Sequence, residues 1–220
     1  VLSLILFSGT VQSQEDAGFA LELEEGNHLD VRHQGRLLAR YMIAHDTSSE
    51  ERHHETYKPY LHVYDAKGEN PITKGAGGQF THHRGIFFGY SRLGFDGKQY
   101  DRWHMKGGDQ VHTEFLTREA GEEEAKCVSR IEWQDETGRA FLVEDRAMGF
   151  LVPPTGCYAL IDFHTTLRAP LGQVELRGDP EHAGVQFRPA DEVDRKRTTY
   201  YFPGEKIDPK KDHDLPWLGE

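Results

Sequence analysis

The feature that most constrains the fold of this chain is a succession of short segments in which apolar and polar residues alternate. In the second half they follow one another closely, at about residues 111–118, 125–134, 140–150, 157–169 and 173–177. Turn sequences, Asp-Glu-Thr-Gly at 135–138 and Pro-Pro-Thr-Gly at 153–156, separate the middle ones. Alternation with a period of two is typical of half-buried strands, and no segment has the long 3.6-residue period of a helix. Strands joined without helices favour antiparallel sheets.

The first half of the chain has the same pattern with longer interruptions. Further strands are predicted at about residues 19–24, 29–32, 37–43, 57–64, 86–89, 183–188 and 198–202. Residues 45–56 are polar and residues 91–108 are loop-like, so we interpret both as loops. No internal repeat is visible. We therefore expect an all-β fold, an antiparallel β-sandwich, with a mutarotase-like supersandwich as its larger form.

Composition limits what such a sandwich can bind. The 220 residues are 36% hydrophobic and 11% aromatic, which is enough to build the core of one domain, expected at residues 14–220. The net charge of −11 argues against a nucleic-acid partner, which needs a basic surface, and against docking on anionic lipid. A small-molecule or glycan ligand remains as the expected partner.

Both ends of the sequence suggest processing or truncation. Residues 1–7 are apolar and residues 8–14 are small and polar, which is typical of the end of a secretory signal peptide. We interpret residues 1–13 as its remnant and expect export to the periplasm or the extracellular space. The run is too short to span a bilayer, so no membrane insertion is expected, and an N-terminal hydrophobic strand is the alternative. At the other end, the apolar group around Trp217 suggests that C-terminal strands are missing.

Export would permit a disulfide between the two cysteines of the chain. Cys127 and Cys157 both fall in strand-like segments with one strand between them, which leaves pairing open. Their wide spacing argues against a cysteine-based metal site.

Reactive side chains concentrate in residues 81–89, where His82, His83 and Arg84 lead into a short apolar strand. In an extended chain His82 and Arg84 share one face and His83 takes the other. Imidazoles can ligate a metal, transfer protons or donate to an oxyanion, and a guanidinium can hold carboxylate or sugar oxygens. The alternative is one hydrogen-bonded core histidine and one solvated histidine.

Counting with a period of two brings further polar residues together on strand faces. The groups are His112 with Glu114, Asp162 with His164, and His182 with Gln186 and Arg188. If these faces lined one concave sheet, they would form a site of acids, imidazoles and a guanidinium. The alternative for each group is the solvated outer face of a sandwich.

Three sequence blocks occur in a recognisable order. They are Lys-Pro-Tyr-Leu-His at 58–62, His-His-Arg-Gly at 82–85 and Asp-Pro-Glu-His-Ala-Gly-Val-Gln-Phe-Arg at 179–188. With Leu-Pro-Trp at 215–217, they resemble the bacterial family carried under the name "PmoA family" or "methane oxygenase PmoA". The resemblance covers about residue 19 to the end.

The resemblance implies an exported β-sandwich of unknown function, often in genomic company that suggests glycan degradation, with more strands after Trp217. Methane oxidation is not implied, because the membrane subunit of particulate methane monooxygenase has several transmembrane helices and this chain has no complete membrane span. Two departures matter. Phe80-Thr81 stands where family members usually have His-Pro. In addition, His62 is followed directly by Val63, whereas family members often have a proline between this histidine and the valine. A metal site that needed a third imidazole before His82 would lack it here.

The leading hypothesis is an exported protein that acts on or binds carbohydrate. Its candidate catalytic residues are His82, His83 and His182 as proton carriers and Glu114 as base. Its candidate substrate-binding residues are Arg84, Trp103, Asp162, His164, Gln186 and Arg188. Trp103 would stack on a sugar ring or lie in the core.

Two alternatives remain open. The first is a metal-dependent oxidase or hydrolase in which His62, His82 and His83 with one carboxylate hold Zn, Fe or Cu. The second is a non-catalytic module that binds a glycan or a protein. The absence of His-Glu-x-x-His and of Gly-x-Ser-x-Gly argues against the usual metalloproteases and serine esterases.

Overall fold

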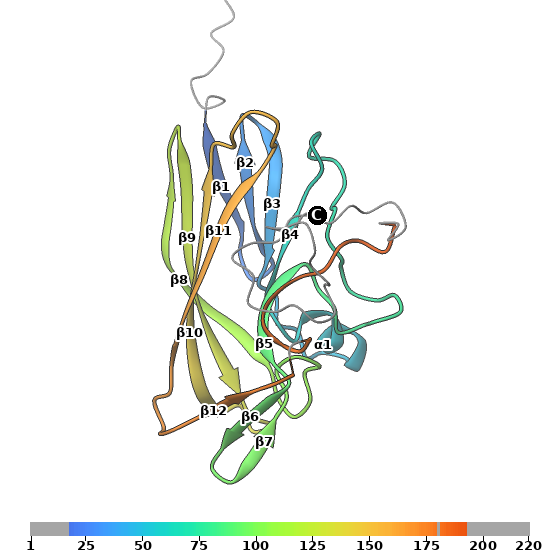
Figure 1. Cartoon of the computed structure of the whole chain (residues 1–220), viewed down its shortest axis with the longest axis vertical. Coiled ribbons are helices and arrows are strands. Elements are labelled where there is room, and N and C mark those ends of the chain that lie inside the picture. Colours follow the sequence, from blue (N-terminus) through green and yellow to red (C-terminus); the bar gives the residue numbers. More distant parts are fainter. Residues whose placement is uncertain (1–17, 180, 193–220) are drawn as a thin grey trace, which may run out of the picture.

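A computed structural model of the chain, which describes residues 18–179 and 181–192, confirms the all-β antiparallel fold class (Figure 1). The described strands and helix, in chain order, are β1 (Phe19–Glu24), β2 (His28–His33), β3 (Arg36–Met42), α1 (Glu50–Thr56), β4 (Tyr60–Val63), β5 (Ile86–Tyr90), β6 (Arg92–Phe95), β7 (Lys98–Tyr100), β8 (Gln110–Ala120), β9 (Glu124–Gln134), β10 (Ala140–Leu151), β11 (Leu160–Arg168), β12 (Glu175–Arg177) and β13 (Ala183–Phe187).

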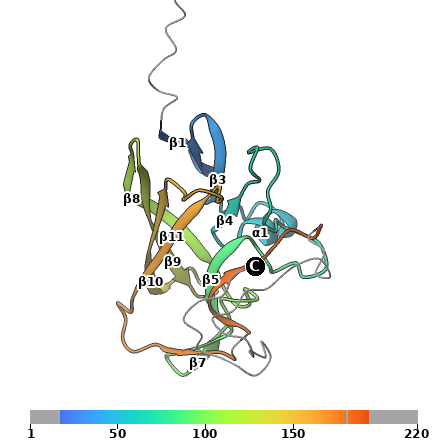
Figure 2. The same cartoon turned by 45° about the horizontal axis from the view of Figure 1, so that its top comes forward.

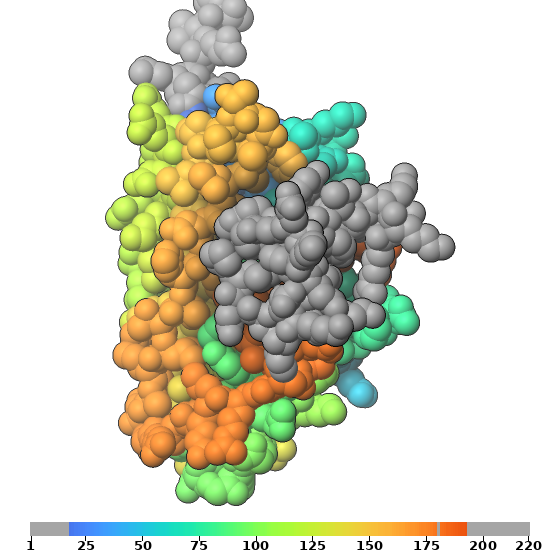
Figure 3. All heavy atoms as spheres, in the orientation of Figure 1, coloured from blue at the N-terminus to red at the C-terminus, as the bar shows by residue number. Residues whose placement is uncertain are grey.

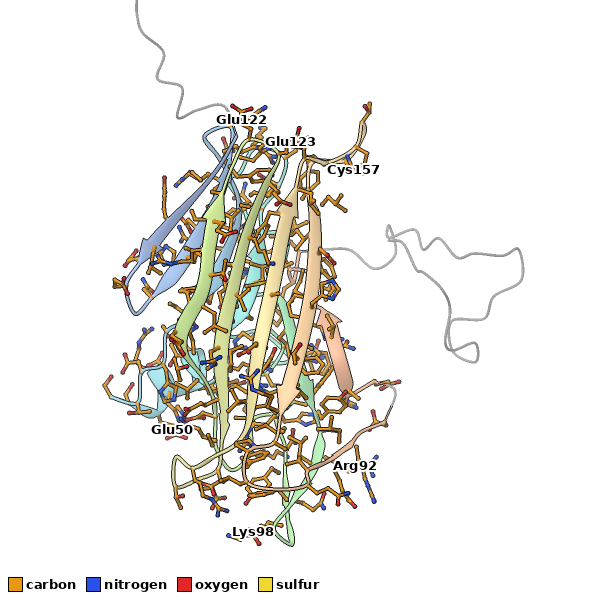
Figure 4. All side chains as sticks on the ribbon, turned by 90° about the vertical axis from the view of Figure 1, so that its left-hand side faces the viewer. Glu50, Arg92, Lys98, Glu122, Glu123 and Cys157 are labelled. Atoms are coloured by element: carbon orange, nitrogen blue, oxygen red, sulfur yellow. The ribbon has the colours of Figure 1, made fainter. Side chains whose placement is uncertain are left out.

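These strands form three sheets. The six-stranded sheet has the order β1-β2-β3-β4-β5-β13, the four-stranded sheet β11-β10-β9-β8, and the small sheet β12-β6-β7. All of their pairings are antiparallel. Figure 4 looks onto the four-stranded sheet, whose long strands run nearly the length of the molecule.

The two larger sheets pack face to face around a common apolar core. Leu29, Val31 and Tyr41 from the six-stranded sheet meet Cys127 and Met148 from the four-stranded one. A second cluster around Trp133 joins β9 and β10 to β5 and to the small sheet. In Figure 3 the atoms of β8–β11 run along one whole side of the molecule.

A buried ion pair lies within this sandwich. The Arg146 guanidinium donates to the Glu144 carboxylate at 2.7 and 3.1 Å, and both side chains are fully buried. The Trp133 indole N–H and the Thr165 hydroxyl also donate to Glu144, each at 2.9 Å. Arg146 reaches the carbonyl of Pro59 at 3.0 Å, which ties the four-stranded sheet to the segment before β4. The charges of Arg146 and Glu144 thus neutralise each other, as burial of an ion pair requires.

The outer face of the six-stranded sheet carries a smaller core of its own. Tyr60, Phe87 and Trp103 pack there, with Met42 against them. Because side chains alternate along a strand, Phe87 points to this face while Phe88 points into the sandwich. Helix α1 lies on the side of β4 and β5 that faces away from β8–β11, as Figures 1 and 2 both show.

The structure corrects two loop assignments. Residues 50–56, expected within an exposed loop, form α1, which begins after the N-cap Ser49 whose side chain accepts the N–H of Arg52 at 3.1 Å. The segment 91–108 contains the β6–β7 hairpin. Seven residues are too few to cross a bilayer, and the described part of the chain has no helix that could do so.

Cys127 and Cys157 are both free in the structure. Cys127 is buried in the core between the sheets, and burial raises the pKa of its thiol to about 12. Cys157 is exposed in the loop before β11, at the same end of the four-stranded sheet as Glu122 and Glu123 (Figure 4). The expected signal remnant, the strand at 198–202 and Trp217 lie outside the described residues.

Candidate functional site

Four histidine rings gather on the outer face of the six-stranded sheet. His82 lies 4.4 Å from His83 and 4.6 Å from His104, measured between ring centroids. His104 in turn lies 5.2 Å from His182. The four come from three separate segments: the loop before β5, the turn after β7 and the residue before β13. We call this group the imidazole cluster.

Two members of the imidazole cluster are held by aspartates. His104 Nδ1 lies 2.8 Å from an Asp101 carboxylate oxygen, and His182 Nδ1 lies 2.5 Å from one of Asp179. The hydrogen bond from His182 lowers the pKa of Asp179, which favours the ionised carboxylate. An ionised carboxylate can only accept a hydrogen bond, so each Nδ1 carries the hydrogen and each Nε2 is left as an acceptor.

Backbone hydrogen bonds to each aspartate hold the turn that carries its histidine. One Asp101 carboxylate oxygen accepts the backbone N–H groups of Trp103 and His104, at 2.9 and 2.8 Å, while the other holds the His104 ring. At the second site the Asp179 carbonyl accepts the backbone N–H of His182 at 3.1 Å. Each aspartate therefore fixes both the turn and the ring that the turn carries.

Apolar and cationic side chains form the floor beneath the cluster. The Trp103 ring is fully buried between Phe87, at 4.9 Å, and His182, at 5.5 Å. The Arg188 guanidinium carbon lies 5.6 Å from the Trp103 ring centroid. The Lys58 ammonium donates to the Trp103 carbonyl at 2.9 Å and lies 3.7 Å from the centre of the Phe87 ring. Burial holds the pKa of Lys58 well below its usual value.

The two adjacent histidines are poor proton acceptors in this setting. Burial, helped by the neighbouring His104, lowers the pKa of His82 to about 4. Burial and the nearby Arg188 lower the pKa of His83 to about 3. Both rings are thus neutral near pH 7, able to donate or accept hydrogen bonds without carrying charge.

A cleft adjoins the cluster. It has a volume of about 870 Å³ and is lined by His104 and Met105, by Ala76 and Gly77 of the loop after β4, and by residues of α1 and its flanks. His53, His54 and Tyr57 are among the latter. His104 therefore belongs to the imidazole cluster and also lines an opening large enough for a small molecule.

The family model described as "Family of unknown function (DUF6807)" matches residues 28–219. The chain belongs to this family. The match includes all four histidines of the imidazole cluster and both aspartates that hold them. No curated protein and no solved structure matches the chain.

Two residues singled out in the sequence of this DUF6807 protein, Arg84 and Trp103, are buried and contribute through the protein interior. Arg84 is fully buried and donates to the carbonyls of Thr81, of His83 at 2.9 Å and of His54 at 2.9 Å. It ties the double-histidine loop to the end of α1 and has no surface for a ligand. Trp103 is equally buried, which leaves no face on which a sugar ring could stack.

His62 lies on the same outer face but is held separately. Its Nδ1 lies 3.0 Å from the Thr73 hydroxyl and its ring packs on Tyr60 at 5.1 Å. In residues 18–179 and 181–192, the groups of three metal-ligating side chains close enough to share an ion do not include His62 with His82 and His83. The metal site of the sequence hypothesis is thus not assembled.

The remaining sequence candidates lie on two different sheets. In β13, Gln186 is paired with Phe87 and therefore lies on the outer face, as Arg188 does two residues later. Val185 and Phe187 are on the opposite face, as expected, but are exposed at this edge of the sheet. Asp162 and His164 pair with each other at 3.1 Å on the exposed face of β11, away from the core.

The grouping of His112 with Glu114 is corrected. Irregular register in β8 between these two residues breaks the alternation. His112 turns inward to the Ser129 hydroxyl at 2.7 Å, whereas Glu114 reaches the exposed Arg130 at 2.8 Å. Glu114 is thus paired at the surface of the four-stranded sheet and takes no part in the imidazole cluster.

Sequence reasoning missed His104, Asp101 and Asp179. The spacing of His104 after Asp101 and of His182 after Asp179 is the same, three residues, and this repeated Asp-x-x-His pattern was the available signal. Nothing local in the sequence indicates that the two patterns meet, because strands β8 to β12 lie between them in the chain.

Proposed function

We propose that this DUF6807 protein binds an oxygen-rich small molecule, a sugar or sugar acid, at the imidazole cluster and transfers protons on it by general acid–base catalysis. The observation that carries the proposal is the facing pair His104 and His182, each with its Nδ1 on an aspartate. An aspartate behind an imidazole orients the ring and stabilises the imidazolium that forms when Nε2 takes up a proton.

The two rings can divide the proton transfer between them. The neutral ring removes a proton from a carbon next to a carbonyl, or from a sugar hydroxyl, at its Nε2. The other ring, protonated beforehand, returns a proton to the same atom of the substrate or to a neighbouring one. One proton leaves and one arrives, so the net reaction is an isomerisation or epimerisation that needs no oxidant or reductant.

The neighbouring residues suit binding more than proton transfer. Because their pKa values are so low, His82 and His83 remain neutral and offer hydrogen bonds to hydroxyl oxygens. Arg188 adds a cation next to them, which suits a carboxylate or a developing oxyanion. The polar character of the cluster and the burial of Trp103 favour a hydroxylated ligand over an apolar one.

The carbohydrate assignment also draws on the sequence blocks at 58–62, 82–85 and 179–188. They lie inside the matched range and underlie the resemblance to the family named after PmoA, whose members often occur in glycan-degrading company. Export to the periplasm or the extracellular space belongs to the same proposal.

Hydrogen–deuterium exchange into candidate substrates tests the function without knowledge of the product. We would incubate the protein in D2O with aldoses, ketoses, uronic acids and aldonic acids, and follow carbon-bound protons and anomer exchange by NMR. Catalysed exchange on one of them, lost in His104→Asn and His182→Asn, is the expected result. His164→Asn is the matched control, since His164 also pairs with an aspartate but lies on the exposed face of β11.

The contrary outcomes are equally clear. If no compound exchanges but one of them binds and its binding requires Arg188, the protein is a binding module and not an enzyme. Exchange that survives both His→Asn substitutions would refute the proposed roles of His104 and His182.

A further inference from the structure

A second group of histidines lies outside the imidazole cluster, between the start of α1 and the start of β8. His45 Nε2 is 2.9 Å from one carboxylate oxygen of Asp109. His53 Nε2 is 2.8 Å from the same oxygen and 2.9 Å from the other. The two rings stand nearly perpendicular, with centroids 5.9 Å apart. One donor atom from each of the three residues lies within 4.8 Å of the others.

Three separate segments of the chain supply this group. His45 follows β3, His53 is in the last turn of α1, and Asp109 directly precedes β8. Backbone hydrogen bonds hold Asp109 in place: its carbonyl accepts from Gln134 at 2.8 Å, and the next residue, Gln110, donates to the Tyr57 carbonyl at 3.0 Å. The same Tyr57 caps the end of α1, so the aspartate and the helix are fixed relative to each other.

Two imidazole nitrogens and one carboxylate are a donor set for a divalent transition metal. Two histidines and a carboxylate hold the ion in catalytic zinc sites, and the same set with open positions holds iron in non-haem oxygenases. In both cases the protein supplies three ligands and leaves the rest of the coordination sphere to water or substrate. Here both histidines present Nε2 toward the same carboxylate, so an ion would replace the hydrogens that they now share with it.

The surroundings favour a cation and give it access. His53 lines the cleft of about 870 Å³ that also reaches His104, and its side chain is 40% exposed. Glu50, Glu51 and Glu55 line the same cleft. Carboxylates at the rim of a cleft raise the local concentration of cations. Asp109 itself is 16% exposed, which shields the ligand oxygen while leaving the histidine side open.

We propose that His45, His53 and Asp109 form a binding site for one divalent transition-metal ion, of the zinc type, with at least one coordination position open to the cleft. The proposal does not depend on the acid–base chemistry proposed above, because it concerns other residues and is read out by metal binding alone. A bound ion would place a Lewis acid on the cleft that His104 borders, so that a ligand in the cleft could contact both.

Metal titration of the full chain tests this site. The protein would be stripped with a chelator, dialysed, and titrated with Zn²⁺ by calorimetry, and with Co²⁺ as a probe whose visible absorption reports nitrogen and oxygen ligation. One equivalent of Zn²⁺ per chain is expected. Removing a ligand should weaken binding by at least about tenfold in His53→Asn and Asp109→Asn, since loss of even an outer-sphere partner has that effect.

His164→Asn is the control for adventitious binding, because His164 also lies beside an aspartate but has no third donor within the described residues. Its affinity for Zn²⁺ should equal that of the unmodified protein. His53 is partly exposed, so its substitution keeps the test sound if Asp109→Asn fails to fold. The proposal is overturned if the unmodified protein takes up no Zn²⁺, or if His53→Asn binds as tightly as His164→Asn does.

Discussion

The rings of His104 and His182 face each other with centroids 5.2 Å apart and planes tilted by 35°, although 78 residues separate them in the chain (182 − 104). Each ring is backed by an aspartate three residues earlier. Two oriented imidazoles this close together can both contact one small ligand that lies beside them. This arrangement, rather than the adjacent His82 and His83, is the centre of the candidate site.

The first prediction concerns the aspartates behind these rings. In Asp101→Asn the His104 ring loses the acceptor that fixes its tautomer, since an amide can donate as well as accept. Nitrogen-15 NMR of the imidazoles should show His104 protonated on Nδ1 in the unmodified protein and a mixture of tautomers in the variant. Deuterium exchange into the substrate should fall by roughly 10²–10⁴, the usual contribution of one acid–base group.

The control for this experiment is Asp162→Asn, which removes the aspartate beside the exposed His164. It should leave both the His104 tautomer and the exchange rate unchanged. A His104 ring that is protonated on Nε2 in the unmodified protein would contradict the assigned hydrogen-bond direction.

The second prediction explains the glycine of the His-His-Arg-Gly block. A Cβ on Gly85 would overlap the carbonyl of Leu61, to which β5 is paired in the sheet. Because a backbone carbonyl cannot move aside, Gly85→Ala should lower the free energy of unfolding by about 3 kcal/mol. Urea denaturation measures the loss.

Gly149→Ala is a matched control within a strand. A Cβ there would meet only Asp162 Cβ, at 3.6 Å, which is an ordinary contact. Its unfolding free energy should stay within about 0.5 kcal/mol of the unmodified value. Equal effects of the two substitutions would refute the steric explanation.

The sequence predicted the fold class well because local alternation decides it. In β11 the residues Ile161 and Phe163 turn to the core and Asp162 and His164 to solvent, as a period of two requires. The same arithmetic failed in β8, where the irregular register turns His112 inward. The position of a bulge depends on packing against the neighbouring strand, so it cannot be predicted from the alternation within one strand.

The candidate site was predictable only in part. The double histidine and His182 stood out as residue types, and the structure does bring them together. The burial of Arg84 could not be foreseen, because its three carbonyl partners come from the folded loop and from α1. The approach of His45 and His53 to Asp109 depends on where β8 begins relative to the helix, which local propensity does not encode.

The third prediction concerns the ion pair inside the sandwich. Glu144→Gln keeps the shape of the side chain but leaves the Arg146 guanidinium buried without its counter-charge. Breaking a buried pair from one side costs roughly 3–5 kcal/mol, so unfolding in urea should occur at a much lower concentration. Thr165→Val removes one neutral donor to the same carboxylate and should cost only about 1 kcal/mol. A smaller effect for Glu144→Gln than for Thr165→Val would show that the charge is not held as described.

The last prediction is a pH dependence of stability that involves His112. Burial, with a smaller effect of Arg146, lowers the pKa of His112 to about 4. The ring hydrogen-bonds Ser129 and packs against Phe115 at 4.4 Å. In the unfolded chain its pKa returns to about 6.5. Between these two values the unfolded state binds more protons than the folded state, so stability falls as the pH drops from about 6.5 to about 4.

The size of the effect follows from the shift. A change from 6.5 to about 4 corresponds to roughly 3 kcal/mol for a fully buried ring, and partial exposure of His112 reduces this to about 1–2 kcal/mol. His62, His82 and His83 also have lowered pKa values and titrate in an overlapping range. The comparison that isolates His112 is therefore the slope of unfolding free energy against pH in His112→Asn and in the unmodified protein. The variant loses packing at every pH, but its slope between pH 6.5 and 4 should be shallower, and parallel curves would show that His112 is not buried in its neutral form.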